Sequence, residues 1–141
     1  MKVYLDDIRT PSGEDWIIVR NYNDFMSKIK EIGISNISLI SLDHDLADEH
    51  YRISMYNPDE HYSNYYNDGT FKEKTGYDCA KFLVDFCLNN NLKLPQINVH
   101  SMNPIGSKNI ITLINNFYKF SNINKNCTHV FIHNDSDKFL I

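Results

Sequence analysis

The sequence lacks an excess of positive charge, a long apolar run and a set of paired cysteines. The formal net charge of −4 at pH 7 argues against broad binding to a DNA or RNA backbone, which requires a basic face. A small phosphorylated ligand or a single RNA end is still compatible with this charge. No stretch approaches the length of a membrane-spanning helix, and the first residues lack the apolar segment of a signal peptide. We therefore expect a cytoplasmic protein that does not contact a membrane.

The three cysteines, Cys79, Cys87 and Cys127, are odd in number and lack Cys-x-x-Cys spacing. Neither a disulfide framework nor a zinc site is predicted, and we expect buried thiols. A chain of 141 residues with 42% apolar residues can bury one core but is too short for two domains of ordinary size. Residues 1–141 are therefore expected to form a single domain, and the sequence favours no particular oligomeric state.

Short apolar segments alternate with amphipathic ones along most of the chain. Strands are predicted at 2–5, 16–19, 37–42, 97–101 and 128–133, and helices begin near residues 23, 75 and 103. This alternation predicts an α/β fold, in which a mostly parallel five-stranded sheet has helices on both faces. The arrangement fits a flavodoxin-like three-layer sandwich with one helix missing early in the chain.

The helices have recognisable start and stop signals. Gly33 supplies the stop of the first helix. Thr75 can cap the second, with Asp78 completing a capping box, and Asn103 can cap the third, with Pro104 at its first position. The second helix is predicted to bury a stripe of apolar residues, namely Ala80, Leu83, Val84, Cys87 and Leu88.

Between residues 47 and 74, after the third strand, the apolar periodicity fails. A structureless loop of this length is uncommon in a compact domain, so we expect either a functional lid or a partly ordered insertion. Residues 65–71 contain Asp-Gly between aromatic and β-branched residues and predict a hairpin. Several side chains here could stack on a nucleobase, although a solvated loop is an equal alternative: His50, Tyr51, Tyr56, His61, Tyr62, Tyr65 and Tyr66.

Polar residues follow three of the predicted strands at their carboxyl ends. Ligands of open parallel sheets bind outside these ends, near the switch point of the strand order. In a flavodoxin-like order the first, third and fourth strands are neighbours, so their polar ends should converge on one crevice. The residues are Asp6 and Asp7 after the first strand, Asp43, His44 and Asp45 after the third, and His100, Ser101 and Asn103 after the fourth.

Carboxylates and imidazoles in this crevice suggest two kinds of chemistry. Asp6, Asp7 and Asp43 could hold Mg²⁺ through one or two carboxylates and several waters; alternatively no metal binds and these acids hold basic side chains or cap strand and helix ends. His44 and His100 are predicted to act as an acid–base pair, with Asp43 or Asp45 orienting one ring. A structural role in hydrogen bonding is the alternative for each histidine, and His129 and His133 in the last strand are interpreted as structural.

Two helix starts offer backbone N–H groups that favour an anion. One begins at Thr75 and Gly76, and the other includes Gly106. Further donors suited to phosphate oxygens are Arg9, Ser101 and Asn103. Simple helix capping is the alternative function of these residues.

Together these blocks resemble the cyclic-phosphate processing receiver-like domains. The resemblance extends from residue 3 to about residue 118 and rests on residues 5–11, 42–46, 75–76, 100–106 and 109–110, with Trp16, Val19 and Arg20. It implies a receiver-like fold and activity on cyclic phosphates such as those at RNA ends. Two departures are notable. Ala47 follows the third-strand block where family members have glycine, and the last strand ends at His133 without the lysine of phosphorelay receivers.

The leading hypothesis is a phosphodiesterase-like hydrolase that opens or removes a cyclic phosphate, using the histidine pair and the carboxylates at the strand ends. Its partner would be a phosphorylated small molecule or an RNA end, with Mg²⁺ or no cofactor. The alternative is a non-catalytic receiver-like module that binds a nucleotide or a protein. A phosphorelay receiver that uses Asp43 as phospho-acceptor is disfavoured by the missing lysine.

Overall fold

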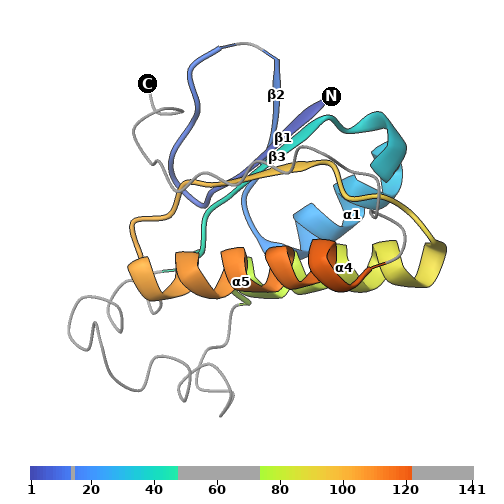
Figure 1. Ribbon diagram of the computed structural model, residues 1–141. Helices are drawn as coiled ribbons and strands as arrows, with labels where there is room; N and C mark the ends of the chain where they lie inside the picture. Colours follow the sequence, from blue (N-terminus) through green and yellow to red (C-terminus); the bar gives the residue numbers. More distant parts are fainter. Residues whose placement is uncertain (14, 48–73, 122–141) are drawn as a thin grey trace.

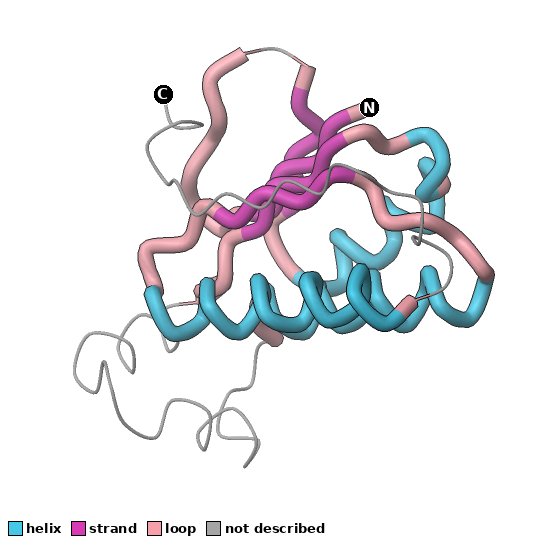
Figure 2. Tube along the Cα trace, viewed as in Figure 1, coloured by secondary structure: helices cyan, strands magenta, loops and turns pink. Residues whose placement is uncertain are grey.

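The computed structural model describes residues 1–13, 15–47 and 74–121 (Figures 1 and 2). The strand order across the sheet is β2-β1-β3-β4, and every pairing is parallel. The elements are β1 (Lys2–Leu5), β2 (Trp16–Val19), α1 (Tyr22–Ile32), the 3₁₀ turn η1 (Ile34–Asn36), β3 (Leu39–Leu42), α4 (Gly76–Asn90), β4 (Gln96–Val99) and α5 (Pro104–Phe120). The α/β class, the parallel sheet and four of the predicted strands are thereby confirmed.

Several predictions concern residues outside the described ranges. These are the fifth strand at 128–133 with His129 and His133, the thiol of Cys127, and the insertion with its hairpin, aromatic residues and histidines. Within the described ranges, Cys79 and Cys87 are free and buried, as predicted. No helix in these ranges is long and apolar enough to cross a membrane.

The helices begin and end where their side chains satisfy the free backbone groups. Asn21 caps α1 by accepting a hydrogen bond from the N–H of Asp24 at 2.9 Å, and Gly33 ends the helix with φ +86°. At the start of α4, the carboxylate of Asp78 accepts from the N–H of Thr75 at 2.9 Å, which forms one half of the predicted capping box. In α5, Asn103 accepts from the N–H of Gly106 at 2.9 Å.

The predicted apolar stripe of α4 is correct except at its margin. Ala80, Leu83, Val84 and Cys87 are buried, whereas 51% of Leu88 is exposed. The four buried residues have the i, i+3, i+4, i+7 spacing of a single helix face, and Leu88 lies at the edge of that face.

The three helices of the described residues, α1, α4 and α5, lie on one face of the sheet (Figures 1 and 2). The connections from β2 to β3 and from β3 to β4 run in the same direction across the sheet, and right-handed crossovers in one direction place their helices, α1 and α4, on one side. The connection from β1 to β2 leads in the opposite direction, and its described residues contain no helix. The prediction of helices on both faces is therefore wrong for the described residues, which form two layers.

Alternation along the strands gives the sheet two different faces. The helix-covered face contributes Val3, Leu5, Ile40, Leu42 and Val99 to the hydrophobic core, where they pack against all three helices. On the opposite face, which no helix of the described residues covers and which we call the helix-free face, the central strands carry the buried residues Tyr4, Ser41 and Asn98.

Candidate active site

Three titratable residues directly follow three neighbouring strands, at equivalent positions of the register. Leu5 of β1 pairs with Leu42 of β3, and Leu42 pairs with Val99 of β4, so the next residues in the chain, Asp6, Asp43 and His100, lie side by side. By strand alternation their side chains point to the helix-free face. All three are buried, and one ligand atom from each lies within 4.8 Å of those of the other two.

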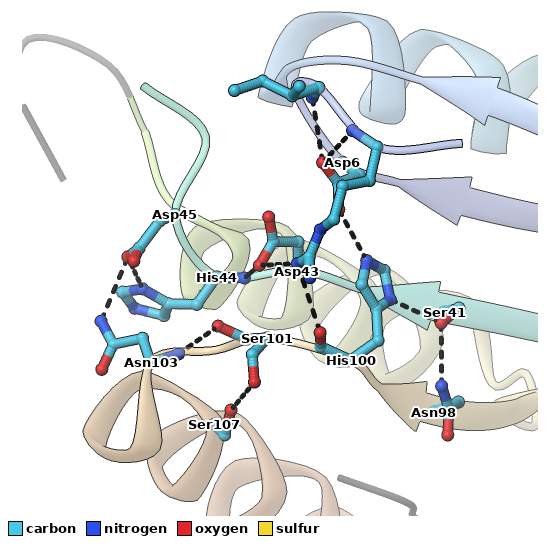
Figure 3. A network of polar contacts seen from close by, with 12 residues as sticks. Asp6, Ser41, Asp43, His44, Asp45, Asn98, His100, Ser101, Asn103 and Ser107 are labelled. Atoms are coloured by element: carbon cyan, nitrogen blue, oxygen red, sulfur yellow. Dashed lines mark hydrogen bonds and ion pairs between the residues drawn. The ribbon is translucent and has the colours of Figure 1, made fainter. Parts of the chain in front are cut away.

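Asp6 has its acceptor sites filled by donors of the protein (Figure 3). Its Oδ1 accepts from the N–H groups of Ile8 (2.9 Å) and Arg9 (2.7 Å), and its Oδ2 accepts from Arg9 Nε at 2.8 Å. His100 Nε2 lies 3.1 Å from the same Oδ2. Burial alone would raise the pKa of Asp6, but these hydrogen bonds and the Arg9 charge lower it to about 2. Asp6 is therefore an ionised acceptor, and His100 Nε2 must donate.

His100 is engaged through both ring nitrogens and one ring face. Its Nδ1 lies 2.7 Å from Ser41 Oγ, which also accepts from Asn98 Nδ2 at 2.9 Å. The ring stacks on Tyr4 with 4.3 Å between the ring centroids. Burial lowers the pKa of His100, although the Asp6 carboxylate opposes this effect. A neutral ring that donates from Nε2 and accepts the Ser41 hydroxyl proton at Nδ1 satisfies all of these contacts.

Arg9 connects the ends of β1, β3 and β4. Besides its bonds to Asp6, its Nη2 donates to the carbonyl of His100 at 3.3 Å and lies 3.4 Å from Asp43 Oδ1. Burial would lower the pKa of Arg9, but Asp43 and Asp6 raise it. About 21% of the Arg9 side chain is exposed. Arg20 fixes the loop that follows β1 by donating to the backbone carbonyls of Asp6 (3.0 Å) and Arg9 (2.6 Å).

Within the described part of the chain, Asp43 is bound through one of its two carboxylate oxygens. Its Oδ1 accepts from the N–H of His44 at 2.8 Å, whereas Oδ2 is buried and has no hydrogen-bond partner among the described residues. Burial, followed by the charge of Asp6, raises the pKa of Asp43 well above its usual range, and Arg9 opposes this effect.

His44 belongs to a second cluster, on the side of the sheet edge where the helices begin. Its Nδ1 lies 2.8 Å from Asp45 Oδ1, and Asn103 Nδ2 donates to that same oxygen at 3.1 Å. In Figure 3 the His44 ring points towards Asp45 and Asn103, and the His100 ring points towards Asp6 and Ser41. The rings of the two predicted acid–base residues therefore lie on different sides of the strand ends and do not face each other.

Two glycines allow the helices to approach this second cluster. A Cβ at Gly106 would overlap the His44 ring, and a Cβ at Gly76 would overlap the backbone carbonyl of Asp43. The N–H of Gly76 donates to the His44 carbonyl at 2.7 Å. The amino ends of α4 and α5 thus pack directly against the residues that follow β3.

Most of the predicted phosphate donors have partners within the protein. The N–H groups of Gly76 and Gly106 bind the His44 carbonyl and the Asn103 side chain. Ser101 Oγ accepts from the N–H of Asn103 at 3.0 Å, a bond that does not use its own hydroxyl proton. The Thr75 hydroxyl is buried and has no hydrogen-bond partner among the described residues. Arg9 is therefore the charged donor best placed to reach a ligand.

A family model described as the cyclic-phosphate processing receiver domain matches residues 1–116. The chain belongs to this family. No curated protein and no solved structure matches the chain. The match includes all of the site residues and ends inside α5, so the receiver-domain family is established for the whole described site.

In this receiver domain, the predicted magnesium site does not fit the donor arrangement. Asp6 already accepts four hydrogen bonds, which use the lone pairs a cation would need. Arg9 supplies positive charge between Asp6 and Asp43, and Mg²⁺ would have to displace it to reach an octahedral set of oxygens. The group of possible ligands contains His100 and not the predicted Asp7, which is half-buried beside Asp6.

Four residues of the site were missed by the sequence-based reasoning. Tyr4, Ser41 and Asn98 precede Asp6, Asp43 and His100 by two positions, and Arg20 follows β2. The two-residue repeat of a strand would have identified the first three, because side chains two positions apart share a face. Nothing in the sequence alone indicates the contacts of Arg20 with two carbonyls.

Proposed function

We propose that this receiver domain hydrolyses a cyclic phosphodiester, such as an RNA 2′,3′-cyclic end or a cyclic nucleotide. Membership of the family supports a role in cyclic-phosphate processing. The observation that carries the specific proposal is the buried His44–Asp45 pair, one residue away from the carboxylate that contacts Arg9. A proton carrier and a phosphate-binding cation thus lie on the two sides of the residues that follow β3, at the carboxyl end of the sheet.

His44 is the general base of the proposed reaction. With Nδ1 held by the Asp45 carboxylate at 2.8 Å, the ring is fixed in one tautomer. Nε2 then takes a proton from the attacking water as the water oxygen bonds to phosphorus. Asn103 keeps the Asp45 carboxylate in place through its 3.1 Å hydrogen bond, and it is a positioning residue rather than the predicted phosphate donor.

Arg9 and Asp43 act on the phosphate and the leaving oxygen. The Arg9 guanidinium neutralises charge that develops on the phosphate oxygens. As the phosphorus–oxygen bond to the sugar breaks, the leaving oxygen needs a proton. Asp43 is suited to donate it, because its Oδ2 is buried without a described partner and its pKa is raised by burial and by Asp6. The product is a phosphomonoester and a free hydroxyl.

His100 has a positioning function in this proposal, in contrast to the acid–base function predicted for it. Both of its ring nitrogens are engaged, by Asp6 and by Ser41. It fixes the carboxylate that orients Arg9, so its effect on catalysis is transmitted through Asp6.

The test is turnover of cyclic phosphates by the full chain and by His44→Gln and Asp45→Asn. Substrates are 2′,3′-cyclic and 3′,5′-cyclic mononucleotides and a short RNA with a 2′,3′-cyclic end, each with added Mg²⁺ and with a chelator. Formation of phosphomonoester is followed by ³¹P NMR. His44→Gln should reduce turnover a hundredfold or more, the usual contribution of a positioned acid or base (about 10²–10⁴).

Asp15→Asn is the matched control for Asp45→Asn. Asp15 is exposed and precedes β2 at the opposite edge of the sheet, so its replacement should leave turnover unchanged. Full activity of His44→Gln would contradict the proposed mechanism. Binding of a cyclic phosphate without any product, with and without metal, would instead support a non-catalytic receiver-like module.

A further inference from the structure

A groove of about 430 Å³ lies between α1 and α4, which pack side by side in the helix layer (Figure 1). None of its lining residues belongs to the candidate active site. Most of its lining residues are aromatic residues or lysines, namely Tyr22, Phe82, Phe86, Lys30, Lys74 and Lys81.

The three rings form a row along the groove. The ring centroids of Tyr22 and Phe82 are 6.5 Å apart, and those of Phe82 and Phe86 are 5.6 Å apart. All three side chains are half-buried, so each packs on the core and also borders the groove. Rows of partly exposed aromatic rings are the usual stacking platforms for single-stranded nucleic acids.

The lysines give this groove a positive charge in a chain whose formal net charge is −4. Lys74 lies 5.3 Å above the Tyr22 ring and Lys30 lies 5.9 Å above the Phe82 ring. The lysines outnumber the two acidic groups of the lining, Asp78 and Asp85. Cation–π contacts at exposed sites are weak, so these amino groups can turn from the rings to phosphate oxygens when a base stacks.

The groove begins where the candidate active site ends. Lys74 precedes the start of α4, where the N–H of Gly76 donates to the carbonyl of His44 at 2.7 Å. From Gly76 to Phe86 the helix rises about 15 Å, at about 1.5 Å per residue. A strand whose end lies at the site can therefore continue along α4 over the row of rings.

We infer that this groove binds the last few nucleotides of a single-stranded RNA whose 3′ cyclic phosphate lies at His44 and Arg9. The inference rests on the proposed function for its choice of RNA end. It also explains how an acidic protein can hold RNA, because the contact is confined to one groove and needs no basic face.

Two measurements test the groove. In the first, kcat/KM is compared for a 2′,3′-cyclic mononucleotide and for a hexaribonucleotide with the same cyclic end. In the second, binding of a fluorescent hexaribonucleotide with a 3′-phosphate is measured by anisotropy over a range of salt concentrations. The second measurement needs no turnover, so the groove can be tested even if the proposed chemistry fails.

The variants are the double substitution Lys30→Ala/Lys81→Ala and the single substitution Phe86→Leu, which keeps apolar volume but removes a ring. Phe86→Leu should weaken hexanucleotide binding about tenfold, the effect of losing one stacked base. The lysine variant should reduce the slope of log K against log salt by about 0.7 for each phosphate that the protein no longer neutralises. Neither variant should change kcat/KM for the mononucleotide.

Lys119 and Phe120 provide a matched control, because they form a similar pair on α5 with Lys119 Nζ 5.4 Å from the Phe120 ring centroid, away from the groove lining. Lys119→Ala and Phe120→Leu should leave hexanucleotide binding unchanged. Equal binding by the groove variants and the wild-type chain would overturn the inference, as would equal kcat/KM for the mononucleotide and the hexanucleotide in an active enzyme. Loss of turnover with groove-dependent binding would overturn only the proposed function.

Discussion

The surroundings of the two histidines differ in kind. His100 lies on the helix-free face, between the Asp6 carboxylate and the Ser41 hydroxyl, with its ring stacked on Tyr4. His44 lies where two helices begin, beside Asp45 and against Gly106. The first ring contacts residues of the sheet and of the β1 end through both nitrogens and one face, whereas the second contacts the residue that follows it and the start of α5.

This difference shows that two histidines at neighbouring strand ends can have separate functions. A ring engaged at both nitrogens by the sheet fixes the groups around it, whereas a ring whose Nδ1 lies against a carboxylate is arranged as a proton carrier is in other enzymes. We therefore assign the proposed activation of water to the His44 cluster and the orientation of Arg9 to the His100 cluster. The following predictions test that division.

Replacing Gly106 with alanine should have the largest effect on stability, at the His44 cluster. At an open helix position this change stabilises by about 1 kcal/mol. Here the added Cβ overlaps the buried His44 ring, and overpacking of this kind costs about 3 kcal/mol. The free energy of unfolding, measured by urea denaturation, should therefore fall, and turnover should fall with it because the ring is displaced.

Ser107→Ala is the control for this substitution on the same helical turn. The Ser107 hydroxyl makes one long hydrogen bond of 3.4 Å to the Ser101 carbonyl, so its loss should cost at most about 1 kcal/mol. An increase in stability of Gly106→Ala would show that the helix start does not press on His44.

The second prediction concerns the charge of the His100 cluster. The pKa of Asp6 is lowered from 3.8 to about 2 in the folded protein. Its carboxylate therefore stabilises the fold above about pH 4, and this contribution is lost as the pH falls from about 4 towards 2. The shift corresponds to about 2 kcal/mol. Unfolding free energies measured between pH 2 and pH 6 should show this fall in stability at low pH.

Asp6→Asn should reduce the fall in unfolding free energy at low pH. Asp15→Asn, at an exposed position, should leave this fall unchanged. An identical pH dependence for the wild-type chain and Asp6→Asn would mean that the hydrogen bonds to Asp6 do not depend on its charge. The separation between a charged positioning cluster and the His44 cluster would then no longer hold.

The smallest expected effect comes from Tyr4→Phe. The Tyr4 hydroxyl is buried and has no hydrogen-bond partner among the described residues. Its removal should stabilise the protein by about 1 kcal/mol, because an unsatisfied buried polar group is costly, while the stacking on His100 is retained. Chemical denaturation of the two proteins measures this difference. A loss of stability would reveal a partner for the hydroxyl and a larger polar network around His100.

Much of the fold could be predicted from the sequence because its signals are local. Gly33 and Asn103, both predicted from the sequence, mark helix ends through a positive φ and through a hydrogen bond to a neighbouring residue. The layering could not be predicted in the same way, since the face that a helix covers depends on the direction of its crossover. The sequence did predict that one helix is missing early in the chain. A helix between β1 and β2 would have covered the opposite face, because that crossover runs in the opposite direction across the sheet.

The candidate site was predicted as a set of residues but not as two clusters. Asp43 and His44 were assigned to one crevice because both follow β3. Consecutive residues at the end of a strand point to opposite faces, so Asp43 joins Asp6 and His100 whereas His44 joins Asn103. The contacts that fill the predicted anion sites, such as Gly76 with the His44 carbonyl, depend on tertiary packing and have no local signal.

The equivalent positions of Asp6, Asp43 and His100 have a consequence for how this domain can vary in length. Each of the three follows a strand whose side chains alternate, so inserting or deleting one residue in Leu39–Leu42 would turn Asp43 towards the helices and His44 towards Arg9. Side chains in β3 can be exchanged without this inversion, but its number of residues cannot change by one. Whether the number of residues in β3 is even or odd therefore determines which residue after the strand faces Arg9 and which faces the helices.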